Sequence, residues 1–149
     1  MTLITANGFK SYHLHTPTTD IDHASDIASA VSWFNRLSFP LRHRAIGVAA
    51  NQVGVMDSIF VAKIKNVWKF FINPKVVGRS EAMVNSVESC LSVHNTTVSV
   101  KRYEWVEIEW LDRKGEVQKG RFYHHIYPMI QHEIDHLHGI LITDKVEDK

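Results

Sequence analysis

Residues 131–136 read QHEIDH, and within them His132, Glu133 and His136 form an HExxH pattern. Residues four apart lie one above the other on the same face of an α-helix, so the two imidazole rings can point their nitrogens at one metal ion. Glu133 sits at the edge of that face, where a carboxylate can take a proton from water without binding the metal itself. This stretch therefore predicts a metal-binding helix with Glu133 as its general base.

The flanking residues mark the ends of this helix. The helical pattern begins at about Tyr127 or Pro128 and ends at Leu137. Proline suits the first turn of a helix, and a glycine such as Gly139 suits the position just beyond its end. The sequence predicts a helix from about residue 127 or 128 to residue 137.

A second, N-terminal helix is predicted over residues 21–37. Apolar residues recur there every three or four positions, which is typical of an amphipathic helix. Thr19 or Asp20 is available as the N-cap, and Pro40 follows the end. We expect this helix to pack its apolar face on the core.

The residues between the helices carry short runs rich in β-branched and aromatic side chains, which favour strands. The run WVEIEWL at 105–111 alternates apolar with acidic residues, and DRKG at 112–115 predicts a turn, so we expect a hairpin with one wet face. Tyr103 and Trp105 stand at odd positions, whereas the apolar residues of the following alternation stand at even positions. A bulge within 101–104 would bring both sets of side chains to the same face. Further strands are expected at 46–50, 58–64, 68–73 and 98–100. Strands grouped between two helices indicate an α+β fold rather than alternating βαβ units.

Length and composition narrow the classes of protein. A chain of 149 residues predicts a single domain, 1–149, and 44% hydrophobic residues supply its core. The net charge of +1 is too small for a protein that binds a polyanion mainly through its charge, so no direct nucleic-acid partner is expected. The longest apolar runs are only a few residues, too short to predict a membrane span. With Cys90 as the only cysteine, no internal disulfide can form, and we expect a soluble intracellular protein.

Two histidines do not complete a catalytic metal site, which typically keeps three protein ligands and one open position. A third histidine six residues after His136 would suit one class of HExxH enzyme, but that position holds Ile142. The short polar tail offers only Asp144 and Glu147, which we judge poor ligands. Upstream, the residue with the strongest metal affinity is Cys90, so it is the predicted third ligand.

Three segments together resemble the peptide deformylase family. The segment 88–92, ESCLS, is similar to that family's EGCLS motif, and 131–136 matches its QHEIDH motif. The segment 45–52, AIGVAANQ, is similar to its glycine-rich first motif. All three occur in the family's order, and the similarity spans roughly residues 40–142. The resemblance implies antiparallel β-sheets packed around a central helix that carries the HExxH pattern.

The resemblance also implies a reaction, namely hydrolysis of the N-formyl group from the methionine that begins a new polypeptide, with release of formate. Enzymes of the family typically use ferrous iron, with nickel, cobalt or zinc as substitutes, and the sequence does not distinguish among these ions. The implied partners are N-formylmethionyl peptides and nascent chains near the ribosome. We expect a cytoplasmic monomer that contacts no membrane.

Each matching residue then receives an expected role. Cys90 would bind the metal as a thiolate, beside His132 and His136. The side-chain amide of Gln52 and the backbone N–H of Leu91 would stabilise the oxyanion of the tetrahedral intermediate, and loss of one such donor typically costs about 2.7–4 kcal/mol. We expect Glu133 to take the proton of the attacking water and pass it to the leaving amine.

The predicted substrate pocket involves Gly47, Pro128 and Met129. Pro128 and Met129 precede His132 by about one helical turn on the same face, and we expect them to wall an apolar pocket for the methionine side chain. Gly47 is the retained glycine of the first motif. Glu88 and Ser92 are expected to hold their loop by hydrogen bonds rather than to react.

Two residues depart from the family pattern. Ala45 stands where the family usually has its first glycine, and Ser89 replaces the glycine before the cysteine. If residue 89 needed a positive φ, serine would cost about 1 kcal/mol more than glycine and shift Cys90 and Leu91. We therefore expect altered or lower activity rather than its loss.

Two other functions stay open from the sequence. One is an HExxH peptidase that cleaves internal bonds and uses a third ligand other than Cys90. The other is an inactive relative that only binds nascent N-termini, which Ala45 and Ser89 make conceivable. Retention of Glu133 and Gln52 speaks against the inactive relative.

Overall fold

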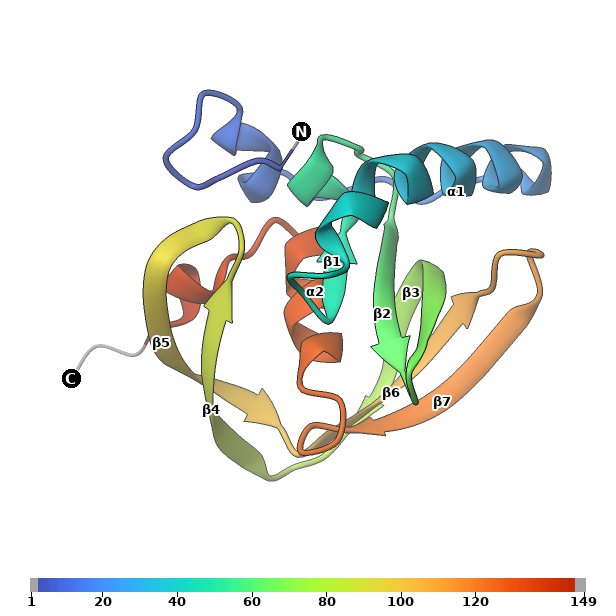
Figure 1. The fold of residues 1–149 in the computed structure, drawn as a ribbon. Coiled ribbons are helices and arrows are strands. Elements are labelled where there is room, and N and C mark those ends of the chain that lie inside the picture. Colours follow the sequence, from blue (N-terminus) through green and yellow to red (C-terminus); the bar gives the residue numbers. More distant parts are fainter. Residues whose placement is uncertain (1–2, 147–149) are drawn as a thin grey trace.

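The computed structural model describes residues 3–146, and in it two antiparallel sheets flank a short helix, α2 (Figure 1). The predicted α+β class is confirmed. Two α-helices and seven strands form the fold of the described residues: α1 (Ala24–Ser38), β1 (Gly47–Ala49), β2 (Ile59–Ile64), β3 (Val67–Arg79), β4 (Met83–Cys90), β5 (Val93–Tyr103), β6 (Trp105–Leu111), β7 (Val117–Tyr123) and α2 (Met129–Leu137). Four short 3₁₀ helices accompany them: η1 (Ser11–His15), η2 (Phe39–Leu41), η3 (Ala50–Val53) and η4 (Ile142–Lys145).

The larger sheet has five strands in the order β1-β2-β3-β6-β7, and β4 pairs only with β5. Val106 and Ile108 of β6 are buried while Glu109 is exposed, as the predicted hairpin requires. Its turn is held by Asp112, whose Oδ1 accepts hydrogen bonds from the backbone N–H groups of Lys114 and Glu116. The face of the hairpin that carries Glu109 is exposed to solvent.

The expected bulge within 101–104 is wrong. Tyr103 is the last residue of β5 and Trp105 the first of β6, so the change of parity marks a passage from the small sheet to the large one. Each strand keeps its own alternation, and Glu104 joins them. The strand β4 was not among the expected runs, because polar residues such as Asn85, Ser86 and Ser89 interrupt its apolar pattern.

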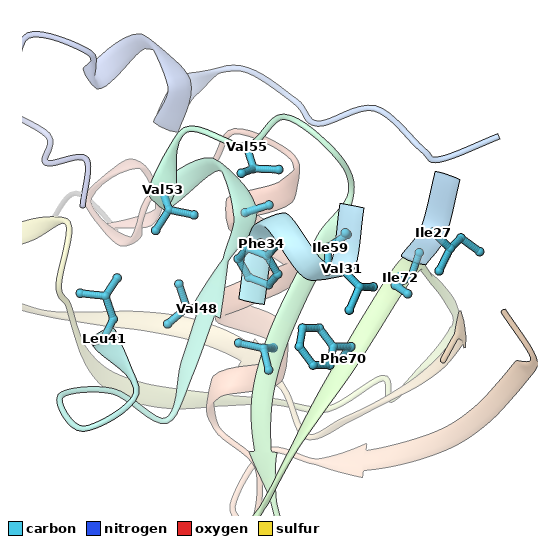
Figure 2. Packing of buried hydrophobic residues seen from close by; sticks show 12 residues of the cluster. Ile27, Val31, Phe34, Leu41, Val48, Val53, Val55, Ile59, Phe70 and Ile72 are labelled. Atoms are coloured by element: carbon cyan, nitrogen blue, oxygen red, sulfur yellow. The ribbon is translucent and has the colours of Figure 1, made fainter. Parts of the chain in front are cut away.

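The strand β2 is buried on both faces and separates two core clusters. Ile59 and Val61 face the cluster under α1, which Figure 2 shows around Phe34 and Val48. Phe60 and Ala62 face the other cluster, under α2. Successive side chains of a strand point to opposite faces, and both faces of β2 are covered. Nearly all of its residues are therefore apolar.

The two helices begin and end close to the predicted residues, with one difference. The helix α1 begins at Ala24 rather than at residue 21, and its N-cap position is His23 rather than Thr19 or Asp20. The backbone N–H and carbonyl groups of Ile21 are hydrogen-bonded to the side-chain amide of Asn73 on β3, which leaves them unavailable to the helix.

The helix α2 ends where Gly139 adopts a φ of 78°, as predicted, with Pro128 at the N-cap position. A methyl group at Gly139 would also press within 2.8 Å of the backbone of His15. Within the described residues, no helix is long and apolar enough to cross a membrane.

Candidate metal centre and active site

The helix α2 presents two histidines to the end of strand β4. His132 Nε2 lies 3.2 Å from His136 Nε2, one helical turn away. The Sγ atom of Cys90 lies 3.3 Å from His136 Nε2, although the two residues are 46 positions apart in the chain. These three ligand atoms all lie within 4.8 Å of one another. The tertiary structure thus gathers the three residues that the sequence singled out as metal ligands.

The spacing of the three donor atoms fits a bound cation. A tetrahedral ion with metal–nitrogen bonds of 2.0–2.1 Å and a metal–sulfur bond of 2.3 Å separates its ligand atoms by roughly 3.3–3.6 Å. The observed separations, 3.2 Å between the two histidine Nε2 atoms and 3.3 Å between Cys90 Sγ and His136 Nε2, are close to those edges, and the third pair of donor atoms lies within 4.8 Å. Burial and the neighbouring His132 hold the pKa of His136 well below its ordinary value, so its imidazole is neutral, as a metal ligand must be.

A buried carboxylate orients His132. Glu88 Oε1 lies 2.9 Å from His132 Nδ1, which places the ring proton on Nδ1 and turns Nε2 toward Cys90. Burial alone would raise the pKa of Glu88, but its hydrogen bonds with Arg102 and His132 outweigh burial and hold the pKa well below its usual range. Burial alone would lower the pKa of His132, but the neighbouring Cys90 and Glu88 outweigh burial and raise it to about 10.

Sequence reasoning missed Arg102, the largest fully buried side chain of the described residues. Its Nε and one terminal nitrogen donate to the two oxygens of Glu88 at 2.8 Å and 2.7 Å, and the other terminal nitrogen donates to Asp135. The signal was present in the sequence. Val98, Val100 and Arg102 alternate on one face of β5, and an arginine at a core-facing position indicates a buried anionic partner.

We expect Arg102→Lys to lower the free energy of unfolding by about 1–3 kcal/mol, because lysine keeps the charge but cannot reproduce the planar fork on Glu88. Chemical denaturation of the purified protein measures this. The control is Arg121→Lys, since Arg121 binds Glu107 through the same two nitrogens at an exposed site, where the change should be undetectable. Equal loss in both variants would contradict the prediction.

Glu133 lies beside the cluster with its side chain 3% exposed. Burial raises the pKa of this carboxyl to about 7, although the charge of His132 acts in the opposite direction. Its buried Oε1 has no hydrogen-bond partner within residues 3–146. A carboxylate with a free oxygen and a pKa near neutrality suits a general base.

Gly47 is the residue that leaves room for this carboxylate. A methyl group at Gly47 would lie 2.7 Å from Glu133 Oε2 and 3.0 Å from its Cγ, closer than non-bonded atoms approach. The sequence predicted Gly47 as a substrate-binding residue. The structure places it in the cavity wall as well, but its direct contact is with Glu133.

We expect Gly47→Ala to lower kcat by about tenfold to a hundredfold, because Glu133 must move by a large fraction of an ångström to avoid the new methyl group. Metal content should be unchanged. The control is Gly120→Ala on β7, where the nearest side-chain atom is 3.4 Å from the added carbon and turnover should be kept. Steady-state kinetics with metal analysis decide it, and full activity of Gly47→Ala would refute the steric role.

Gln52 lies in η3 and points its amide nitrogen at the cluster. Its Oε1 accepts a hydrogen bond from the backbone N–H of Ala49, which fixes the orientation of the amide. Its Nε2 donates to Ser92 Oγ at 3.1 Å and lies 3.7 Å from Cys90 Sγ. Ser92 therefore supports the loop by a hydrogen bond, as expected, and Gln52 holds a donor at the edge of the candidate metal site.

A cavity of about 370 Å³ opens over these groups, a volume typical of small-ligand sites. Its wall combines the candidate reactive groups with apolar side chains. The predicted site residues that line it are Gly47, Gln52, Cys90, Leu91, Pro128, Met129, His132 and Glu133, while His136 lies beneath them.

The expected strain at Ser89 is wrong. Within the described residues the positive-φ positions other than glycine are Lys65, Asn66, Asn73 and Asn95. Ser89 lies in strand β4 with an exposed side chain, so serine fits there without cost.

Of the tail carboxylates, Asp144 accepts a hydrogen bond from the backbone N–H of Leu141, and Glu147 lies outside the described residues.

The fold and the donor set together define an α+β protein with an HExxH-type cluster of one cysteine sulfur and two imidazole rings. The sequence model of the family described as polypeptide deformylase matches residues 6–149. The chain belongs to the polypeptide deformylase family. Members of this family depend on a metal ion, and the cluster of Cys90, His132 and His136 is where the described residues could hold one.

Individual relatives agree with this assignment. The chain is 34% identical over 112 residues to peptide deformylase 2 of Nostoc sp., covering 68% of this chain and 63% of that protein. It is 35% identical over 105 residues to the peptide deformylase of Heliobacterium modesticaldum, covering 70% of this chain and 69% of that protein. The matched segment thus spans about two thirds of the length of these relatives.

Solved structures share the fold. The peptide deformylase of Thermotoga maritima superposes with a TM-score of 0.86 at 23% identity, covering 98% of this chain and 97% of that one. The peptide deformylase of Synechococcus elongatus, solved in complex with actinonin, superposes with a TM-score of 0.84 at 26% identity, covering 99% of this chain and 79% of that one.

Proposed function

We propose that this protein removes the formyl group from the N-terminal methionine of newly made polypeptides and releases formate. The observation that carries the proposal is the buried carboxylate of Glu133 beside the Cys90–His132–His136 cluster, at one cavity of about 370 Å³. The family of the chain supports the same reaction. A hydrolysis needs a nucleophile, a base and a place for the oxyanion, and the site offers groups for each.

The chain's own residues divide the reaction as follows. Glu133 takes a proton from the attacking water and later delivers it to the amine nitrogen of methionine. Gln52 Nε2 and the backbone N–H of Leu91 donate to the developing oxyanion. Glu88, itself held by Arg102, keeps His132 Nε2 turned toward the cluster.

We propose that Cys90, His132 and His136 hold one divalent ion, which is Fe²⁺ in the cell and can be replaced by Ni²⁺, Co²⁺ or Zn²⁺. A bound ion of this kind polarises the carbonyl group and lowers the pKa of water. One thiolate and two neutral imidazoles suit any of these borderline cations.

We also propose that Pro128 and Met129 wall the pocket for the methionine side chain. Both line the cavity together with His132, and a thioether packs well against such apolar groups. In the cell, the protein would act in the cytoplasm as a monomer of one domain, residues 1–149, on nascent chains near the ribosome.

The test is release of formate from a formyl-Met dipeptide by protein loaded with Fe²⁺ without air or with Ni²⁺. Formate should appear in step with a free methionine amine, and an acetyl-Met dipeptide should be left intact. Cleavage of internal bonds in unformylated peptides would instead indicate a peptidase. If no formate is released although metal is bound, the protein is an inactive relative that only binds N-termini.

A further inference from the structure

The cleft continues beyond the candidate active site into a second hollow. This hollow measures about 360 Å³ and is lined by the end of β4 and the start of β5. Arg44, Ser89, Cys90 and Leu91 line both spaces. The two spaces therefore adjoin at these residues, so a peptide whose first residue reacts at the cluster can extend its next residues toward the second hollow.

Arg44 is the charged residue at the junction of the two spaces. Its side chain is exposed, and within residues 3–146 its guanidinium forms no ion pair and no hydrogen bond. The carboxylate of Glu88 in the same cleft is already engaged by Arg102 and His132.

The lining of the second hollow adds no negative charge. Besides Arg44 and Cys90, its titratable residue is His94, and none of its lining residues is an aspartate or a glutamate. A guanidinium presents a planar pair of donors that matches a carboxylate. The hollow is thus suited to an anionic group and unsuited to a lysine or arginine side chain.

We propose that Arg44 is a specificity-determining residue that selects substrates with an acidic side chain downstream of the formylated methionine. The inference rests on the proposed deformylation and adds the substrate class that this chain favours. Because Arg44 is solvent-exposed, its effect on selection is modest, about two- to fivefold in kcat/KM. Screening by salt should reduce it.

The experiment compares formyl-Met peptides that carry Glu, Gln or Lys at the second, third or fourth position and end in an amide. In at least one of these series the protein should favour Glu over Gln and Gln over Lys, and the preference should shrink at 0.5 M salt, on the order of a 4–5 Å screening length. Arg44→Glu should invert the order, and Arg44→Lys should keep it.

The control is Lys69→Glu, which changes the net charge equally on β3, where Lys69 is exposed and lines neither space. Its Glu-to-Lys ratio should match that of the unaltered protein. Formate release with the same ratio in every variant and series would overturn the role of Arg44 while leaving the proposed function standing. Release from none of the peptides would end both.

Discussion

Glu133→Gln should lower kcat by roughly 10²- to 10⁴-fold while the protein keeps its metal. Glutamine has nearly the same shape and fits beside Gly47, but its amide cannot accept the proton of the attacking water. Glu133 Oε1 is buried and has no hydrogen-bond partner within the described residues, so it is free to accept a proton from the attacking water. Formate release under saturating substrate, with metal content and thermal unfolding measured on the same sample, tests this.

The matched variant is Glu133→Asp, which keeps the carboxylate and moves it back by one methylene group. It should recover part of the activity that Glu133→Gln loses, since a proton acceptor is present at a longer distance. Wild-type kcat in Glu133→Gln would mean that another group acts as the base. Loss of metal in that variant would assign Glu133 to the ligands instead.

Cys90→Ser should weaken the binding of Ni²⁺ or Zn²⁺ by more than a hundredfold and remove turnover at low metal concentration. Serine cannot supply the thiolate that soft and borderline cations prefer, and loss of a direct ligand should exceed the 10- to 100-fold effect of supporting residues. Competition with a chelator of known affinity measures the change in affinity.

The neighbouring Ser89 provides the control. Its side chain is exposed on β4 and is not one of the three clustered ligand residues, so Ser89→Ala should bind metal like the unaltered protein. A Cys90→Ser protein that is folded by circular dichroism and binds metal with unchanged affinity would place the third ligand elsewhere.

Much of the fold could be read from local patterns. The helix α2 begins and ends near the predicted residues because Pro128 and Gly139 act within a turn of their own positions. The hairpin of β6 and β7 followed from alternation and a turn of four residues. The start of α1 did not, because Asn73, distant in the chain, binds the backbone of Ile21.

The candidate site, too, could be predicted from the sequence only in part. Helical spacing alone paired His132 with His136, and elimination pointed to Cys90. The partners of Arg102 and the contact of Gly47 with Glu133 could not be predicted, because both depend on which elements pack against α2. The expected strain at Ser89 was wrong since strand pairing, which sets its φ, is a tertiary property.

The amino-acid order by itself determined the two imidazoles and the carboxylate on one helix, because a helix relates residues three and four apart wherever it lies. Only the tertiary structure decided that a sulfur 46 residues from His136 lies 3.3 Å from it, and that a buried arginine holds Glu88 against His132. Contacts between distant segments depend on the packing of whole sheets and helices, which no local pattern contains.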